Sequence, residues 1–115
     1  MRYVLLIYGS EADSAMMTQE ERVALMQGHA AFAGEMLKRN LLTSGEALQP
    51  TSTATTIRVR NSQTLITDGP FAETKEQLAG YYVLNCKDLD EAMTMAALVP
   101  DALNGSIEIR PVIEL

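Results

Sequence analysis

The sequence predicts an α+β fold in a single domain that spans residues 1–115. Three observations predict it: short apolar or alternating runs typical of strands, two helix-start signatures, and a length that suits one hydrophobic core. Hydrophobic residues make up 47% of the 115 residues and charged residues 21%, which is ordinary for a globular protein and argues against disorder.

The first two elements are a strand and a long helix. Residues 3–8 are apolar at every position, which is typical of a strand buried on both faces. A polar connection over residues 9–15 follows. Thr18 and Glu21 have the spacing of a capping box, Thr-x-x-Glu, and so predict a helix that runs to Arg39. The packing face of this helix is predicted from apolar residues at helical spacing: Val23, Met26, Ala30, Ala33 and Leu37.

The middle of the chain is expected to be mostly extended. Residues 41–47 predict a second strand with Gly45 at a bend, and residues 49–55, rich in Ser and Thr, predict a loop. Residues 56–60 and 64–67 then alternate or run apolar around a short polar turn, which predicts a hairpin.

The last third repeats the strand and helix pattern. Residues 80–86 predict a strand, and Asp88 with Glu91 predicts a helix that ends at Pro100. Residues 107–112 predict the final strand. The order β-α-β-(ββ)-β-α-β is a ferredoxin-like plan, a mainly antiparallel sheet with an inserted hairpin.

The predicted sheet needs cover on its second face. Two helices can cover only one face of a four-stranded sheet, yet residues 3–8 are apolar throughout, and Tyr81 and Tyr82 point to opposite faces. A second copy of the chain is the simplest cover because two-fold dimers are the commonest assembly. We therefore expect a homodimer.

Charge and cysteine content narrow the classes of partner and site. The net charge of −6 disfavours nucleic acid and anionic membranes, which both require a basic surface. Cys86 is the only cysteine, so we expect no internal disulfide and no metal site. We expect its thiol to be mostly buried and inert, with a redox or nucleophilic role as the alternative. The apolar run near the N-terminus is too short for a signal peptide, and no run reaches the length of a membrane span, so we expect a cytoplasmic protein.

His29 and Asp68 are the candidate catalytic residues. His29 is the only histidine, and imidazole titrates near neutral pH without a large perturbation. It could be a general acid or base, or a half-buried surface histidine. Asp68 could orient His29 as the carboxylate of a dyad. Equally, it could cap its own backbone in an Asx-turn before Gly69 and Pro70.

Residues 68–76 form the most distinctive stretch of the chain, Asp-Gly-Pro-Phe-Ala-Glu-Thr-Lys-Glu. A long polar loop in so compact a chain is more often functional than not. This stretch resembles the signature of the DGPF-domain proteins, a branch of the YciI-like (YCII-related) superfamily. The resemblance implies a dimeric α+β barrel, in which the sheets of two subunits pack face to face.

The resemblance also implies a site. It implies that a histidine of the first long helix, here His29, works with an aspartate as a dyad in a cleft between sheet and helix. Phe71 is expected to anchor the loop in the core, with a pocket wall as the alternative. The residues expected to bind a ligand or shape the cleft are Ser44, Gly45, Phe71, Glu73 and Lys75.

Two functions stay open at this point. Barrels of this class include isomerases, monooxygenases and a dehydrochlorinase, so the resemblance implies a small enzyme that needs no cofactor and takes a small-molecule ligand. DGPF-domain proteins are also often encoded beside extracytoplasmic-function sigma factors, which implies a ligand-binding or regulatory module. A hydrogen-bonded His29 beside a pocket favours the enzyme, and a flat, solvated His29 favours the module.

Overall fold

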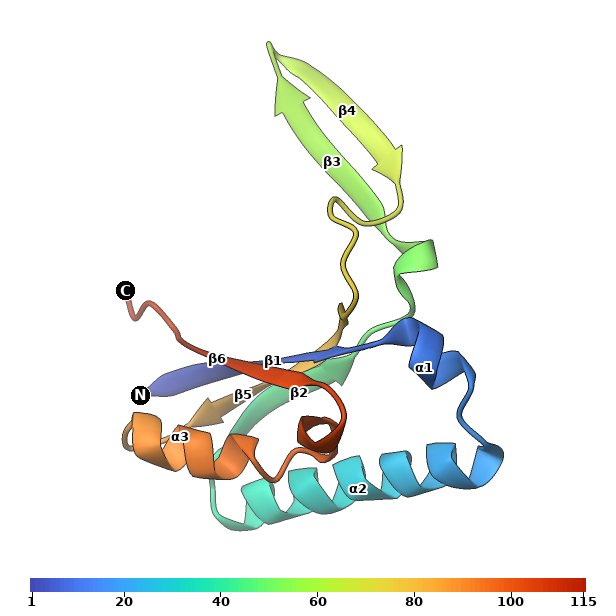
Figure 1. Ribbon diagram of the computed structural model, residues 1–115. Helices are drawn as coiled ribbons and strands as arrows, with labels where there is room; N and C mark the ends of the chain where they lie inside the picture. Colours follow the sequence, from blue (N-terminus) through green and yellow to red (C-terminus); the bar gives the residue numbers. More distant parts are fainter.

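The computed structural model describes residues 1–115 and shows a four-stranded sheet, two helices packed on one face, and a separate hairpin (Figure 1). The sheet contains β1 (Arg2–Gly9), β2 (Leu42–Ala47), β5 (Gln77–Asn85) and β6 (Ser106–Pro111), in the order β2-β5-β1-β6 with every pair antiparallel. The helices are α1 (Glu11–Ala15), α2 (Gln19–Lys38) and α3 (Leu89–Ala96). The predicted α+β class is confirmed, and the strand order agrees with the ferredoxin-like plan.

Both predicted helix starts are confirmed. The Thr18 hydroxyl accepts a hydrogen bond from the backbone N–H of Glu21 at 3.1 Å, and the Glu21 carboxylate accepts one from the backbone N–H of Thr18 at 2.9 Å. The Asp88 carboxylate caps α3 by accepting from the N–H of Glu91 at 2.9 Å. These bonds satisfy backbone donors that have no partner within the helix.

Two helical details differ from the prediction. The polar connection contains a short helix, α1, which Ser10 caps. The helix predicted to begin at Asp88 is α3, and it ends at Ala96 and not at Pro100. Pro100 instead begins a short 3₁₀ turn, η2 (Pro100–Leu103). Proline suits the first position of such a turn because it has no N–H to leave unpaired.

The packing face predicted for α2 is wrong at every named position except Ala33. Val23, Met26 and Leu37 are 42%, 71% and 64% exposed. The protected residues of α2 form a neighbouring stripe, which shares only Ala33 with the prediction: Leu25, Gly28, His29, Phe32, Ala33, Glu35 and Met36. The helix carries apolar residues on several sides, so helical spacing alone fits more than one stripe. The correction moves His29 from the edge of the packing face to its middle.

The core lies between the sheet and the two helices. Its fully buried members come from β1, α2, β5 and the segments that flank α3: Leu5, Met36, Leu84, Cys86 and Val99. Cys86 is 1% exposed, which confirms the expected burial of the thiol.

The second face of the sheet is open. Along β1, Leu5 and Ile7 point to the helices and are buried, whereas Val4 and Leu6 point away and are only half-buried. Tyr81 and Val83 of β5 lie on the same side as Val4 and Leu6. We call these four residues the open face. A single chain therefore buries only one face of the strand that the sequence predicted to be buried on both.

The inserted hairpin, β3 (Thr55–Arg60) and β4 (Gln63–Asp68), is confirmed and forms a two-stranded sheet of its own. Asn61 and Ser62 both have positive φ, 51° and 63°, as a tight two-residue hairpin turn requires. The hairpin projects from the side of the sheet opposite α2 and α3 (Figure 1). The radius of gyration is accordingly 16.0 Å, compared with about 13 Å for a compact chain of about 100 residues.

Candidate functional site

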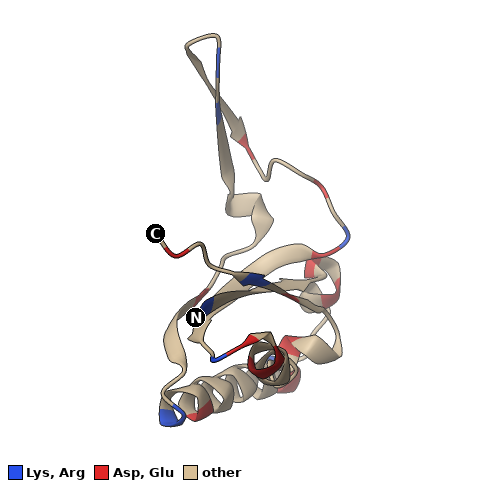
Figure 2. Cartoon of the chain, turned by 90° about the vertical axis from the view of Figure 1, so that its left-hand side faces the viewer, with Lys and Arg blue, Asp and Glu red and all other residues tan.

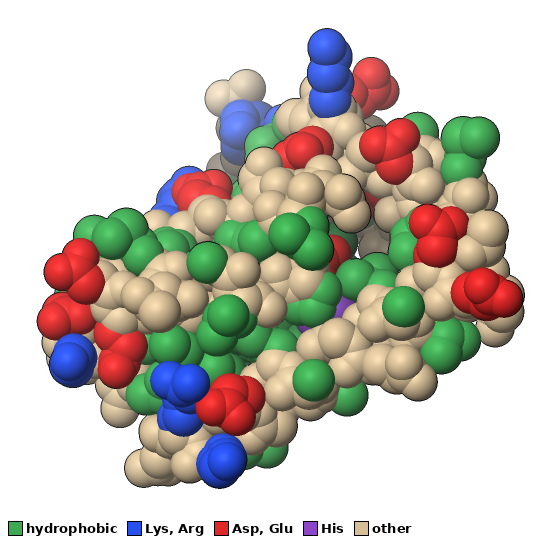
Figure 3. Space-filling model, turned by 60° about the horizontal axis from the view of Figure 1, so that its bottom comes forward, with side chains coloured by type: hydrophobic (Ala, Val, Ile, Leu, Met, Phe, Trp, Pro, Cys, Tyr) green, Lys and Arg blue, Asp and Glu red, His purple; other side chains and the backbone are tan.

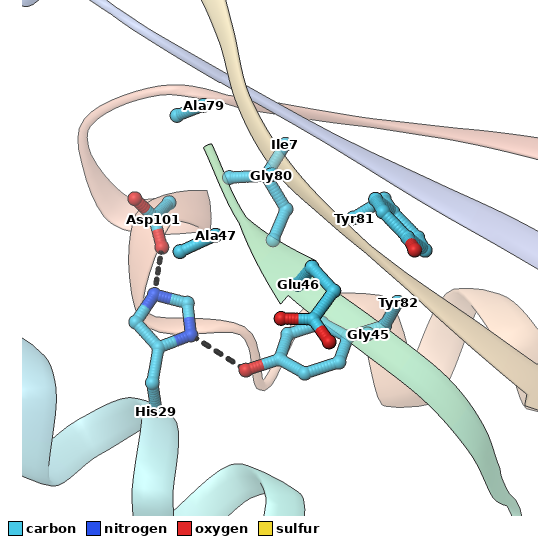
Figure 4. A pocket seen from close by; sticks show the side chains of 10 residues that line it. All are labelled: Ile7, His29, Gly45, Glu46, Ala47, Ala79, Gly80, Tyr81, Tyr82 and Asp101. Carbon is cyan, nitrogen blue, oxygen red and sulfur yellow. Dashed lines mark hydrogen bonds and ion pairs between the residues drawn. The ribbon is translucent and has the colours of Figure 1, made fainter. Parts of the chain in front are cut away.

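His29 is held by a hydrogen bond at each ring nitrogen (Figure 4). Its Nε2 lies 2.5 Å from Oδ1 of Asp101, and its Nδ1 lies 2.8 Å from the hydroxyl of Tyr82. The side chains of His29 and Asp101 are 29% and 20% exposed. We call the three residues the relay. The imidazole is therefore fixed in place and partly shielded from water.

The chemistry of the two partners sets the tautomer of the neutral ring. An ionised carboxylate can only accept a hydrogen bond, so Nε2 of His29 donates to Asp101. Nδ1 of the neutral ring then carries no proton and accepts the hydrogen bond of the Tyr82 hydroxyl. This is the order carboxylate, imidazole, hydroxyl that activates a hydroxyl group in hydrolytic triads.

Three separate elements supply the relay. His29 comes from the middle of α2, Tyr82 from β5, and Asp101 from the turn η2. In α2, a Cβ atom at Gly28 would lie 2.9 Å from Cγ of Pro100. Glycine at that position therefore lets η2 approach α2, which brings Asp101 to His29.

A second glycine makes room for the tyrosine. A Cβ atom at Gly45 of β2 would lie 2.5 Å from the ring of Tyr82 and 2.9 Å from the backbone oxygen of Tyr81. The Tyr82 ring also packs against Phe32, with the ring centroids 4.8 Å apart. These ring contacts thus help to hold the Tyr82 hydroxyl toward Nδ1 of His29.

The surroundings keep Tyr82 protonated. Burial, and secondarily the negative charge of Asp101, raises the pKa of the Tyr82 phenol. Both causes disfavour the phenolate, so the hydroxyl stays a proton donor at neutral pH.

The relay forms part of the wall of a cavity of about 200 Å³ between the sheet and α2. Figure 3 shows the histidine at the bottom of a hollow on this side of the molecule. Ten residues line the His29 cavity: Ile7, His29, Gly45, Glu46, Ala47, Ala79, Gly80, Tyr81, Tyr82 and Asp101. Half of them are hydrophobic, and the hydrogen-bonded polar groups are those of His29, Tyr82 and Asp101, a mixture common in small-molecule sites.

Comparison with known proteins decides the family. The family model described as YCII-related domain matches residues 1–115. The chain belongs to the YCII-related family. An uncharacterised protein of Rhizobium meliloti (strain 1021) is 37% identical over 113 residues, which cover 96% of this chain and 91% of that protein. The resemblance inferred from residues 68–76 is thereby confirmed.

In this YCII-related chain, Asp68 does not reach His29, and the predicted pairing within one chain is wrong. Asp68 is the last residue of β4, where it pairs with Thr55 in the projecting hairpin. The hairpin forms a sheet of its own, so the strand end that carries Asp68 is not an edge of the main sheet. Asp101 supplies the carboxylate instead.

The other predicted site residues divide between the His29 cavity and the outer surface. Gly45 lines the cavity, whereas Ser44, its neighbour in β2, does not. Glu73 and Lys75 line two shallow hollows near the base of the hairpin. Phe71 is 77% exposed, so its expected anchoring in the core is wrong. No residue of the loop after β4 lines the His29 cavity of the same chain.

Sequence reasoning missed Tyr82 and Asp101. Tyr82 was expected only to point to the face of the sheet opposite Tyr81, and its ring packs on the helix side against Phe32. Asp101 had one signal, its place directly after Pro100, because a proline that stops a helix often starts a turn. Nothing in the spacing linked that turn to His29.

No group of three or more His, Cys, Asp or Glu side chains is arranged to hold a metal ion. None of its helices combines the length and the apolar character that crossing a membrane requires.

Proposed function

We propose that this YCII-related protein is a small enzyme that transfers protons on a small molecule held in the His29 cavity. The observation that carries the proposal is the relay itself: the only imidazole is fixed between a carboxylate and a hydroxyl in a cavity wall. Burial alone would require only that each ring nitrogen has some partner, whereas the order carboxylate, imidazole, hydroxyl beside a cavity is the arrangement that moves protons in known sites. The reaction class is general acid–base proton transfer, as in isomerisation or elimination.

The relay defines the path of the proton. A proton leaves the substrate for the Tyr82 oxygen while the hydroxyl proton moves to Nδ1 of His29. The carboxylate of Asp101 stabilises the imidazolium that forms. The reverse transfer returns a proton from Tyr82 to the product, so the relay ends as it began and no cofactor takes part in the step.

A non-catalytic ligand-binding or regulatory module, associated with an extracytoplasmic-function sigma factor, is the alternative. Such a module would use the same cavity without moving a proton. The fixed, half-buried state of His29 favours the enzyme, because a purely regulatory surface does not need an oriented imidazole.

Deuterium exchange tests the proposal without a known substrate. A panel of small carbonyl and imine compounds, each no larger than about one ring with a short substituent, is incubated with the protein in D₂O, and loss of C–H signals is followed by NMR. We expect the protein to accelerate exchange in at least one compound, and His29→Gln to slow it about 10²- to 10⁴-fold. Asp68→Asn is the matched control and should retain exchange.

Two outcomes would oppose the enzyme. Equal exchange with the parent and His29→Gln would mean that the imidazole moves no proton. Binding of panel compounds without any exchange would favour the module.

We further propose that the protein is a homodimer in which the open faces of two subunits pack together, as in a dimeric α+β barrel. The half-buried apolar side chains of the open face support this. The hairpin supports it as well, because Ile57, Val59 and Ile66 on one of its faces are 62%, 60% and 67% exposed. An isolated two-stranded hairpin is marginal in water. The β3–β4 hairpin projects on the same side of the sheet as the open face (Figure 1).

The charge pattern is compatible with such an assembly. Figure 2 shows basic residues on the hairpin, whereas acidic residues are spread over the body of the chain. Arg58 and Arg60 are the basic residues of β3, and the whole chain has a net charge of −6. A hairpin that reaches a second body would therefore meet opposite charge.

Analytical ultracentrifugation tests the assembly. We expect a dimer at micromolar concentration with more than about 1,200 Å² of buried interface. Val83→Glu on the open face should produce monomers, whereas Val23→Glu on the outer side of α2 should not. A monomeric parent, or dissociation by Val23→Glu alone, would contradict the proposed face.

A further inference from the structure

The outer side of α2 carries an apolar stripe that reaches the surface. Its large members Val23, Met26 and Leu37 are 42%, 71% and 64% exposed. The members lie three, four, three and four positions apart along the helix: Val23, Met26, Ala30, Ala33 and Leu37. We call these residues the outer stripe. Figure 3 views the helix side of the molecule and shows hydrophobic side chains at its surface.

The spacing of the outer stripe is that of a helix packed against another helix. Apolar residues that alternate three and four positions apart form the seam of such a contact, because they stay on one side of the helix. Phe32 and Met36, on another side of α2, already belong to the core. A helix that is apolar all round is normally buried all round. The outer stripe therefore fits a second helix that lies outside the chain.

The charges of α2 lie at its two ends. Between Val23 and Gly34 the helix contains no Asp, Glu, Lys or Arg. Glu20 stands in the first turn and Lys38 in the last. They are 18 positions apart, which is about five turns of 3.6 residues, so both lie on the same flank of the helix. Neither takes part in an ion pair within the chain.

This charge pattern is complementary to an antiparallel copy of itself. When a second α2 runs the opposite way about a two-fold axis near Ala30, the same flank of each helix faces the other. Glu20 of each copy then meets Lys38 of the other copy, as a two-fold contact requires. In a parallel pair, Glu20 would face Glu20 and Lys38 would face Lys38. The small side chains of Ala30 and Ala33 let the two helices approach closely at the centre.

We propose that α2 pairs antiparallel with α2 of a second copy of the chain through the outer stripe. The contact is separate from the open face and from the His29 cavity, so it goes beyond the proposed function. It uses one helix of each copy, which places it among small interfaces of less than about 1,200 Å². We therefore expect it to be weaker than the sheet-face dimer and to join such dimers further only near about 1 mM protein.

Sedimentation equilibrium of the full chain at about 10 µM and about 1 mM tests the pairing, because association depends on concentration. We expect the mean mass of the parent to rise between the two concentrations. Met26→Glu should weaken the association at least about tenfold, because each pair would bury two unpaired carboxylates. Met16→Glu is the matched control: Met16 is 84% exposed and caps α1, away from the outer stripe, so this variant should associate like the parent.

Charge exchange tests the antiparallel arrangement. Glu20→Lys and Lys38→Glu each place like charges together at both ends of the pair, and each should weaken the association at 1 mM about fivefold or more. The double variant with both substitutions faces opposite charges again and should regain the mass of the parent. In a parallel pair, each single substitution would leave like charges facing like and would cause no loss.

The outcomes separate this inference from the other proposals. A mean mass that stays the same from 10 µM to 1 mM would overturn the pairing. Loss of association in Met16→Glu equal to that in Met26→Glu would also overturn it, and a double variant as weak as the single ones would overturn the antiparallel arrangement. A mass of one chain at 10 µM would contradict the sheet-face dimer alone, and the rise at 1 mM would still report the α2 pair. None of these results depends on proton transfer at His29.

Discussion

Replacing Gly28 by alanine tests how the relay is assembled. The new Cβ atom would lie 2.9 Å from Cγ and 3.4 Å from Cβ of Pro100, closer than packed carbon atoms approach. The turn η2 must therefore move, and it carries Asp101. Gly34→Ala is the matched control, because it lies in the same helix and its Cβ atom would meet nothing within 4 Å.

The two substitutions share one free-energy term and differ in another. Alanine is favoured over glycine inside a helix by about 0.8–1.0 kcal/mol, so Gly34→Ala should raise the free energy of unfolding by about that amount. At Gly28 the same gain is opposed by overpacking, which typically costs about 1–3 kcal/mol. We therefore expect Gly28→Ala to be at least about 1 kcal/mol less stable than Gly34→Ala.

Urea denaturation at 25 °C measures the difference, and NMR of the His29 ring supplies a second readout. The ring signals should shift in Gly28→Ala, because Asp101 moves, and should stay in place in Gly34→Ala. Equal stabilisation by both substitutions with unchanged ring signals would refute the inferred packing of Pro100 on α2.

Three further predictions follow from single contacts. Thr18→Ala should lower the free energy of unfolding by about 1 kcal/mol because it removes the cap of α2; an unchanged urea midpoint would contradict the cap. Burial raises the pKa of the Cys86 thiol, so Ellman's reagent should react fully only in urea, and fast labelling of the folded protein would show an open thiol. The pKa of Tyr82 is raised in the folded state, so its protonated hydroxyl adds to the free energy of unfolding. This contribution is fully present below about pH 10, and it is lost as the pH rises through the folded-state pKa. Above pH 10, the free energy of unfolding should therefore fall less steeply with pH in Tyr82→Phe than in the parent. Equal slopes of the free energy of unfolding against pH in the two proteins would contradict this.

The order of elements could be predicted from the sequence because local chemistry determines it. The capping residues Thr18 and Asp88 mark both helix starts, and the turn at Asn61 and Ser62 marks the hairpin. The buried stripe of α2 could not be predicted, because apolar residues lie on several sides of that helix and only contact with the sheet selects one. The role of Asp101 could not be predicted for the same reason, because it depends on how η2 packs against Gly28.

The site was half predictable for a related reason. His29 stood out as the sole imidazole, and its need for a carboxylate followed from general chemistry. The choice of Asp68 relied on its place after a strand, but that strand belongs to a hairpin that leaves the main sheet. Phe71 failed similarly, because an apolar side chain in a polar loop is buried only where something covers it, and no part of the same chain covers this loop.

The tautomer of His29 tests the central claim most directly, that Asp101 and Tyr82 orient the imidazole for proton transfer. Long-range ¹H–¹⁵N correlation spectra of the chain without an affinity tag report only this ring, since the sequence contains one histidine. In alkaline solution, where imidazole is neutral, we predict a ring protonated at Nε2, with Nδ1 unprotonated, and loss of this preference in Asp101→Ala. A ring protonated at Nδ1, or one that averages both forms equally in the parent, would contradict the relay.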